Sequence, residues 1–160
     1  MTQDELTDVF RKLGVSDPES WASSQVKEGI PQLGRCLVIK ALWDCVTRAG
    51  TTSWIDYDLK HGAETPHGRA IQTMLDAGVD KEVITDLVRF KEAEALREVC
   101  YLLEDYTSVP QNSNSDTGEE YVRWSLRELD SEDQPTDRAI DGLHESFWSL
   151  DPALPENQKS

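Results

Sequence analysis

The chain has 160 residues, of which 31 are acidic and 16 basic, and its formal net charge at pH 7 is −15. A charge of that sign repels the phosphates of nucleic acids and of anionic lipids, which argues against direct binding to nucleic acid or to a membrane surface. A hydrophobic fraction of 38% with five Trp residues argues against intrinsic disorder, which requires low hydrophobicity together with high charge. We therefore expect one folded, acidic domain that attracts basic partners.

The first third of the chain carries start signals for two short helices. Thr2 and Glu5 have the spacing of a capping box, and apolar residues follow at helical intervals as far as Leu13. Asp17 can cap a second helix, and Pro18 suits its first turn. These signals predict an amphipathic helix followed by a shorter one.

Two apolar stretches are expected to form the centre of a helical bundle. The first, PQLGRCLVIKALWDCVTRAG, starts at Pro31, and the second is a long helix from Asp80 to about Tyr106. Shorter helices are expected between them, over residues 52–62 and 65–78. The residues expected to face the core are Trp21, Val26, Leu33, Cys36, Leu37, Ala41, Cys45, Val46, Ile84, Leu87, Val88, Ala95, Leu96, Val99, Leu102 and Leu103.

The composition changes after the last long helix. Residues 107–120 are polar, with Pro and Gly, and indicate a linker or long loop. Residues 121–129 alternate as in a half-buried strand, which would pair through SEDQPTD with the run from Arg138 to Leu143; a helix over 119–129 is the alternative. The sequence thus predicts a mainly α, single-domain helical bundle with a small C-terminal β-hairpin. Its expected parts are the bundle (1–106), the linker (107–120), an acidic segment packed on the bundle (121–151) and a tail (152–160).

The cysteine pattern and the first residues bear on location. Cys36, Cys45 and Cys100 show no C-x-x-C spacing and lie among apolar neighbours, which predicts three buried, reduced thiols. The opening residues MTQDELTDVF lack the basic and apolar regions of a signal peptide. Both observations favour the reducing environment of the cytoplasm.

Candidates for metal binding or catalysis are few. His61, Glu64 and His67 have regular spacing, but Gly62 and Pro66 interrupt the helix that such ligands need, so neither a metal nor another cofactor is expected. His144 stands beside Glu145 and Ser146, and adjacent residues do not form a catalytic triad. An enzyme is therefore the least favoured class, with His61, His67 and His144 as its only proton carriers.

The acidic charge is concentrated in the last third. Residues 1–106 hold 19 acidic and 12 basic residues, whereas residues 107–160, about half that length, hold 12 acidic and 4 basic ones. Two tryptophans lie in this region, and Phe147, Trp148 and Leu150 form an apolar cluster that either docks on the bundle or meets a partner. The predicted partner-binding residues are Trp124, Glu128, Asp130, Glu132, Asp133 and Trp148.

Three stretches, LDAGVD, REVCYLLED and GLHES followed by LDP, resemble a family of small acidic bacterial proteins that is uncharacterised. The resemblance covers about the last half of the chain and implies no activity. In broad type, the chain is also similar to bacterial immunity proteins and antitoxins, which are often small, acidic and helical.

These features favour a binding protein that neutralises or docks a basic protein partner, for example a toxin. Complementary charge speeds the encounter, and a few buried aromatic side chains fix the affinity. The alternative is a mimic of nucleic acid that occupies the site of a DNA-binding protein.

Overall fold

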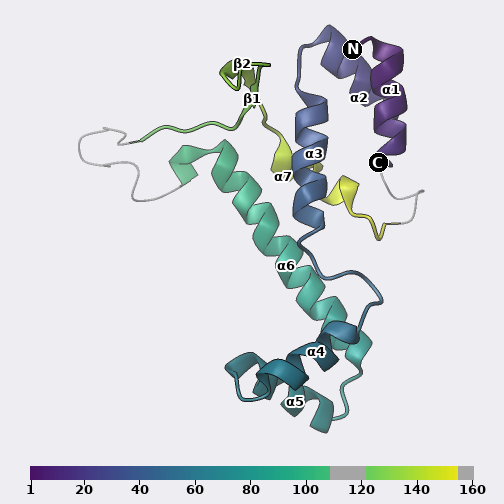
Figure 1. Ribbon diagram of the computed structural model, residues 1–160, viewed down its shortest axis with the longest axis vertical. Helices are drawn as coiled ribbons and strands as arrows, with labels where there is room; N and C mark the ends of the chain where they lie inside the picture. The colour runs from purple at the N-terminus through teal and green to yellow at the C-terminus, as the bar shows by residue number, and fades with distance from the viewer. Residues whose placement is uncertain (109–121, 155–160) are drawn as a thin grey trace. The chain divides into compact units, whose positions relative to one another are not determined.

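The computed structural model describes residues 1–108 and 122–154, and it confirms a mainly α fold with a small C-terminal hairpin (Figure 1). The predicted linker at 107–120 and tail at 152–160 therefore lie largely outside the described residues. None of the described helices combines the length and apolar composition needed to cross a membrane. In chain order the elements are α1 (Gln3–Lys12), α2 (Pro18–Lys27), α3 (Gln32–Trp43), α4 (Ser53–Gly62), α5 (Pro66–Asp76), α6 (Lys81–Glu104), the 3-10 turn η1 (Tyr106–Ser108), β1 (Arg127–Leu129), β2 (Pro135–Ala139), α7 (Leu143–Ser146) and the 3-10 turn η3 (Trp148–Leu150).

The chain is divided into two compact units. Unit 1 comprises residues 1–43 and those from 96 onward, and unit 2 comprises residues 44–95. Helix α6 contributes its first part to unit 2 and its last part to unit 1. Residues beyond 139 supply core side chains to unit 1, whereas residues 44–95, which we expected in one bundle with residues 1–43, form a unit of their own.

Helices α1 and α2 open unit 1 and pack on each other as their capping signals predict. The Thr2 hydroxyl accepts the Glu5 N–H at 3.3 Å, and the Glu5 carboxylate accepts the Thr2 N–H at 2.8 Å, which completes the capping box. Asp17 caps α2 by accepting the Ser20 N–H. Phe10, which is fully buried, meets Trp21 of α2 edge to face at 5.7 Å between ring centroids.

The C-terminal segment of unit 1 docks on α3, beside which α7 lies (Figure 1). The Trp43 ring stacks on Phe147 at 4.7 Å, and its indole N–H donates to the Phe147 carbonyl at 2.9 Å. Phe147 and Leu150 are buried, so the apolar cluster around Trp148 belongs to the core of unit 1. Burial of such aromatic side chains is a major source of stability for this unit.

Unit 2 is built around three isoleucines, one from each helix. Ile55 of α4, Ile71 of α5 and Ile84 of α6 form a buried cluster. The indole N–H of Trp54 donates to the hydroxyl of Thr85, a fully buried residue of α6, at 3.0 Å. This bond satisfies both polar groups inside an otherwise apolar contact.

The hairpin consists of β1 and β2, paired antiparallel with Arg127 opposite Ala139 and Leu129 opposite Pro135. Both strands differ from their predicted ranges. The first was expected over 121–129, but residues 122–126 precede β1. The second was expected over 138–143, but β2 begins at Pro135 and ends before Ile140. The turn explains the difference, because Asp130 closes it over residues 131–134 and so fixes the register. Residue 121 lies outside the described range.

Several residues predicted to face the core are exposed instead. On α6 the buried residues are Ile84, Thr85, Arg89, Ala93 and Cys100, a set that one apolar stripe does not predict. Thr85, Arg89, Ala93 and Cys100 recur at helical spacing on one face that includes polar and small side chains, whereas the prediction followed the large apolar ones. The predicted core residues found exposed are Val26, Leu37, Ala41, Cys45, Leu87, Ala95, Val99 and Leu102.

Candidate protein-binding surface

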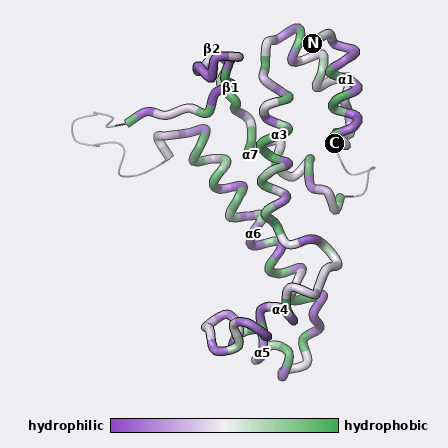
Figure 2. The backbone as a smooth tube through the Cα atoms, in the orientation of Figure 1, coloured by the Kyte–Doolittle hydropathy of each residue, from purple (hydrophilic) through white to green (hydrophobic). Residues whose placement is uncertain are grey.

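The hairpin tip is the most acidic part of the described chain. Residues 128–137 include five acidic residues and no basic one. Figure 2 shows this backbone as mainly hydrophilic, in contrast to the hydrophobic stretches of α3. Three of the five carboxylates, those of Glu132, Asp133 and Asp137, are exposed and form no ion pair with any described residue.

The other two acidic residues of the tip hold the hairpin together. Glu128 is half-buried and pairs with Arg138 of the facing strand at 2.9 Å. Asp130 accepts the N–H groups of Glu132 at 2.8 Å and Gln134 at 3.0 Å, and these bonds lower the pKa of its carboxyl. The predicted site residues 128–133 therefore lie together, but only some of them are free to meet a partner.

Asp133 has a backbone φ of 58°, in the left-handed region that a non-glycine residue rarely adopts. Asp is one of the few side chains that tolerate this conformation, because its short polar group bonds locally. The turn thus holds the Asp133 backbone in a defined conformation, and the side chain is exposed.

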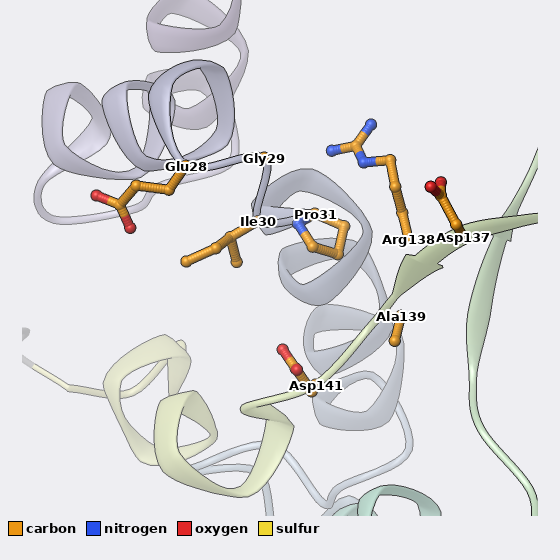
Figure 3. Close-up of a pocket in the computed structure, with 8 residues that line it drawn as sticks. All are labelled: Glu28, Gly29, Ile30, Pro31, Asp137, Arg138, Ala139 and Asp141. Atoms are coloured by element: carbon orange, nitrogen blue, oxygen red, sulfur yellow. The ribbon is translucent and has the colours of Figure 1, made fainter.

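A hollow of about 490 Å³ adjoins the hairpin (Figure 3). Residues 28–31, between α2 and α3, lie on one side of it and the end of β2 on the other. Its charged side chains are Glu28, Asp137, Arg138 and Asp141. Arg138 is paired with Glu128, and Asp141 meets Arg35 at 3.2 Å, so the hollow has an excess of carboxylate.

A second hollow is apolar and lies where the chain enters the hairpin. It has a volume of about 540 Å³ and is lined from α6 by Val99, Leu102 and Leu103 and from the extended segment before β1 by residues 124–126. Sequence reasoning missed the α6 residues as part of a site, although α6 carries more apolar residues than one buried stripe can hold.

The two predicted tryptophans have different surroundings. The half-buried Trp124 lines the apolar hollow, its indole N–H donates to the Leu102 carbonyl at 2.8 Å, and its ring meets Tyr106 edge to face. Trp148 is half-buried against Trp43 and Phe147, with centroids 5.8 and 5.6 Å apart. The structure therefore places Trp124 beside the acidic hairpin and Trp148 in the aromatic cluster on α3.

The three histidines make no common site. His61 ends α4 and its Nδ1 bonds with the Tyr57 carbonyl, whereas His67 begins α5 and bonds with the Thr65 hydroxyl. His144 is in unit 1, so it does not share a unit with the other two. Within residues 1–108 and 122–154, no group of three or more His, Cys, Asp or Glu side chains is arranged to hold a metal ion.

His144 takes part in a contact that sequence reasoning did not predict. The buried carboxylate of Glu104, at the end of α6, binds the His144 ring at Nδ1 and accepts the N–H groups of Leu143 and His144. These are backbone donors at the start of α7 that lack partners within the helix. The contact joins residues 40 positions apart and fastens α7 to α6.

The fold and this surface define a small helical protein that presents an acidic hairpin beside an apolar hollow. No family model, no curated protein and no solved structure matches the chain. The function must therefore be argued from the surface itself.

Proposed function

We propose that the chain is an acidic protein-binding module whose hairpin docks on a basic surface of a partner protein. One observation carries the proposal: Glu132 and Asp133 on the hairpin turn and Asp137 on β2 are exposed and have no ion partner in the described chain. Carboxylates in that state can pair with partner Lys or Arg side chains without first breaking an internal ion pair.

The charges of other described elements support the choice of this surface. On α1, Asp8 pairs with Arg11 at 2.7 Å, and on α6, Glu94 pairs with Lys91 and Glu98 with Arg97. Paired charges on a surface contribute little to the field that steers a partner. The hairpin gathers three unpaired acids within six positions, so we expect a strong local attraction there, while exposed acids such as Glu64, Glu82 and Asp86 contribute to the field elsewhere.

A turn held by Asp130 reduces the entropy lost on binding, since the acidic side chains project from a backbone that is already ordered.

Composition favours one biological role, that of a bacterial immunity protein or antitoxin with a basic toxin as its partner. Nucleic-acid mimicry stays a prediction as well, and no arrangement of the described residues favours it. Three free cysteines support the cytoplasm as the place of action.

Capture from a cell extract of the source organism tests the proposal with two variants of equal net charge. The hairpin variant carries E132Q, D133N and D137N, substitutions that keep the polar shape and suit the left-handed conformation at position 133. The control variant neutralises three exposed acids of unit 2, with E64Q, E82Q and D86N.

We expect the native chain and the control variant to retain the same basic protein at low salt and to release it as salt rises. The hairpin variant should retain little of it. Equal retention by the hairpin variant, or retention that ignores salt, would contradict the proposal.

A further inference from the structure

We infer that the apolar hollow beside the hairpin receives one large apolar side chain of the same partner, from a segment that carries Lys or Arg residues a few positions from that side chain. This inference rests on the proposed function and adds the recognition element that fixes affinity.

The lining of the hollow selects an apolar group. Val99 and Leu102 are 40% and 42% exposed, and together with Leu103 they form the α6 wall of the hollow. The one polar side chain of the lining, Ser125, already accepts a hydrogen bond from the Arg127 Nε at 2.9 Å. The hollow therefore presents carbon atoms and no unused polar side chain of its own.

Trp124 gives the hollow its strongest binding element. Its indole N–H is already bonded to the Leu102 carbonyl, which fixes the ring in place without help from a partner. Tryptophans held in this way are frequent hot spots in protein interfaces, because they bury a large area with little loss of entropy. A volume of about 540 Å³ is within the range of ligand pockets and accommodates a Phe or Leu side chain.

The guanidinium groups near the hollow are held by contacts within the chain, and that of Arg97 is offset by a carboxylate. The guanidinium of Arg127 also donates to the Thr136 carbonyl, that of Arg97 pairs with Glu98, and that of Arg123 lies over the Tyr106 ring at 5.8 Å. The acidic charge within reach of a basic segment belongs to the hairpin tip.

Chain geometry connects the hollow with the tip. Leu126, in the wall of the hollow, is followed directly by β1 and then by the turn at Asp130. At about 3.3 Å per residue these positions are roughly 13 Å apart, which an extended partner segment spans in four residues. A basic residue about four positions from the apolar anchor can therefore reach the tip.

Charge also decides among the possible occupants. A second copy of the chain carries the same net charge of −15 and would be repelled. The chain's own residues 109–120, VPQNSNSDTGEE, are acidic and polar, which suits neither the hollow nor the tip. A basic segment with an apolar side chain suits both the apolar hollow and the acidic hairpin tip.

Two short synthetic peptides test the inference by fluorescence anisotropy against the full chain. One has a single Phe between Lys-rich ends, and the other has Gly in place of that Phe. The pocket variant carries V99S and L102S, and the control variant carries V83S and L87S, the same residue types at exposed positions earlier on the same helix.

The native chain and the control variant should bind the Phe peptide about tenfold or more tightly than the Gly peptide, since a buried apolar side chain contributes at least that much. The pocket variant should bind both peptides alike. Equal binding of the two peptides by the native chain would overturn the inference and leave the proposed function standing.

Other outcomes are equally decisive. A preference for Phe that survives in the pocket variant would place the anchor elsewhere. Sedimentation of a dimer that V99S and L102S dissociate would assign the hollow to a second copy. Failure of both peptides to bind at low salt would count against the proposed function itself.

Discussion

Burial separates the three cysteines into two kinds. Burial raises the pKa of Cys36 to about 11, and burial together with the Glu104 carboxylate raises that of Cys100 to about 11. At pH 8 roughly one such thiol in a thousand is ionised, and the thiolate is the reactive form. Cys45 is exposed, contrary to the expectation of three buried thiols.

We expect a thiol reagent at pH 8 to label one cysteine of the folded chain quickly and the other two only after unfolding. The absorbance of the thiolate that the reagent releases reports the number of labelled cysteines over time. Cys45→Ser should remove the fast phase of labelling. Rapid labelling of three thiols in the folded chain would show that Cys36 and Cys100 are not protected.

Among the acidic residues, Glu104 is the one whose replacement we expect to lower the free energy of unfolding most. Replacement by Ala removes the acceptor of the Leu143 and His144 N–H groups and leaves buried donors without a partner. Such groups cost about 1–3 kcal/mol. The free energy of unfolding, measured in urea, should fall by about that amount.

Glu145 offers the matched control, since it is acidic, exposed and in the same short helix. Glu145→Ala should change the stability by less than about 0.5 kcal/mol. If the two variants proved equally stable, the role assigned to Glu104 would be wrong.

Gly68 shows how two short helices are fitted together. A Cβ at this position would lie 2.1 Å from the carbonyl oxygen of Gly62, a backbone atom that cannot move alone. Gly68→Ala must therefore shift α5 against α4, at a cost of about 1–3 kcal/mol. Thermal unfolding of the full chain should show a lower Tm.

Gly62→Ala is the control for this change. The Cβ of an Ala at position 62 would meet its nearest neighbour, in the Thr65 side chain, at 3.4 Å, which is an ordinary contact. We expect the Tm of this variant to stay close to that of the native chain. Equal loss in both variants would attribute the effect to glycine flexibility and not to the close approach.

The hairpin turn should depend on pH through Asp130. Hydrogen bonds from the Gln134 and Glu132 N–H groups lower the pKa of this carboxyl from its ordinary value of 3.8. Because the pKa is lower in the folded than in the unfolded chain, the turn is fully stabilised above the ordinary value. That stabilisation is lost as pH falls through the lowered one.

Carbon-detected NMR should therefore place the Asp130 midpoint below 3.8, and the Glu132 and Gln134 amide shifts should change with the same midpoint. Asp130→Ala should abolish the coupled change. A midpoint at or above the ordinary value would contradict the assigned turn geometry.

Local spacing explains which elements the sequence predicts well. Capping by Thr2 and Asp17 depends on residues three positions away, so the starts of α1 and α2 follow from the sequence. The buried face of α6 does not follow, because Thr85 and Arg89 lie on it while the large apolar Leu87 is exposed, so a pattern of apolar residues selects a different face.

The same distinction holds for the surface. The acidic run at 128–133 is contiguous, and composition alone identifies it as a candidate site. The apolar hollow joins α6 to residues 124–126 across more than twenty positions, and the Glu104 contact with His144 joins residues 40 positions apart. Pairings of that length depend on tertiary packing, which no local pattern encodes.

For the molecule as a whole, a formal charge of −15 is a property of composition, and the structure shows where its acids gather. Within the described residues, some acids of the helices are paired or serve as caps and others, such as Glu64 and Glu82, are exposed singly, while the hairpin gathers three unpaired acids within six positions. Long-range attraction of a basic partner should thus depend on a small number of side chains and weaken with ionic strength.

Amide shift mapping on the labelled full chain tests this central claim most directly, with the Lys-rich, Gly-centred peptide as the basic probe. The account predicts that shifts concentrate at residues 128–141, disappear at high salt and are lost in the E132Q, D133N and D137N variant. Shifts spread evenly over the acidic residues of α1, α4 and α5, or shifts that the variant retains, would contradict it.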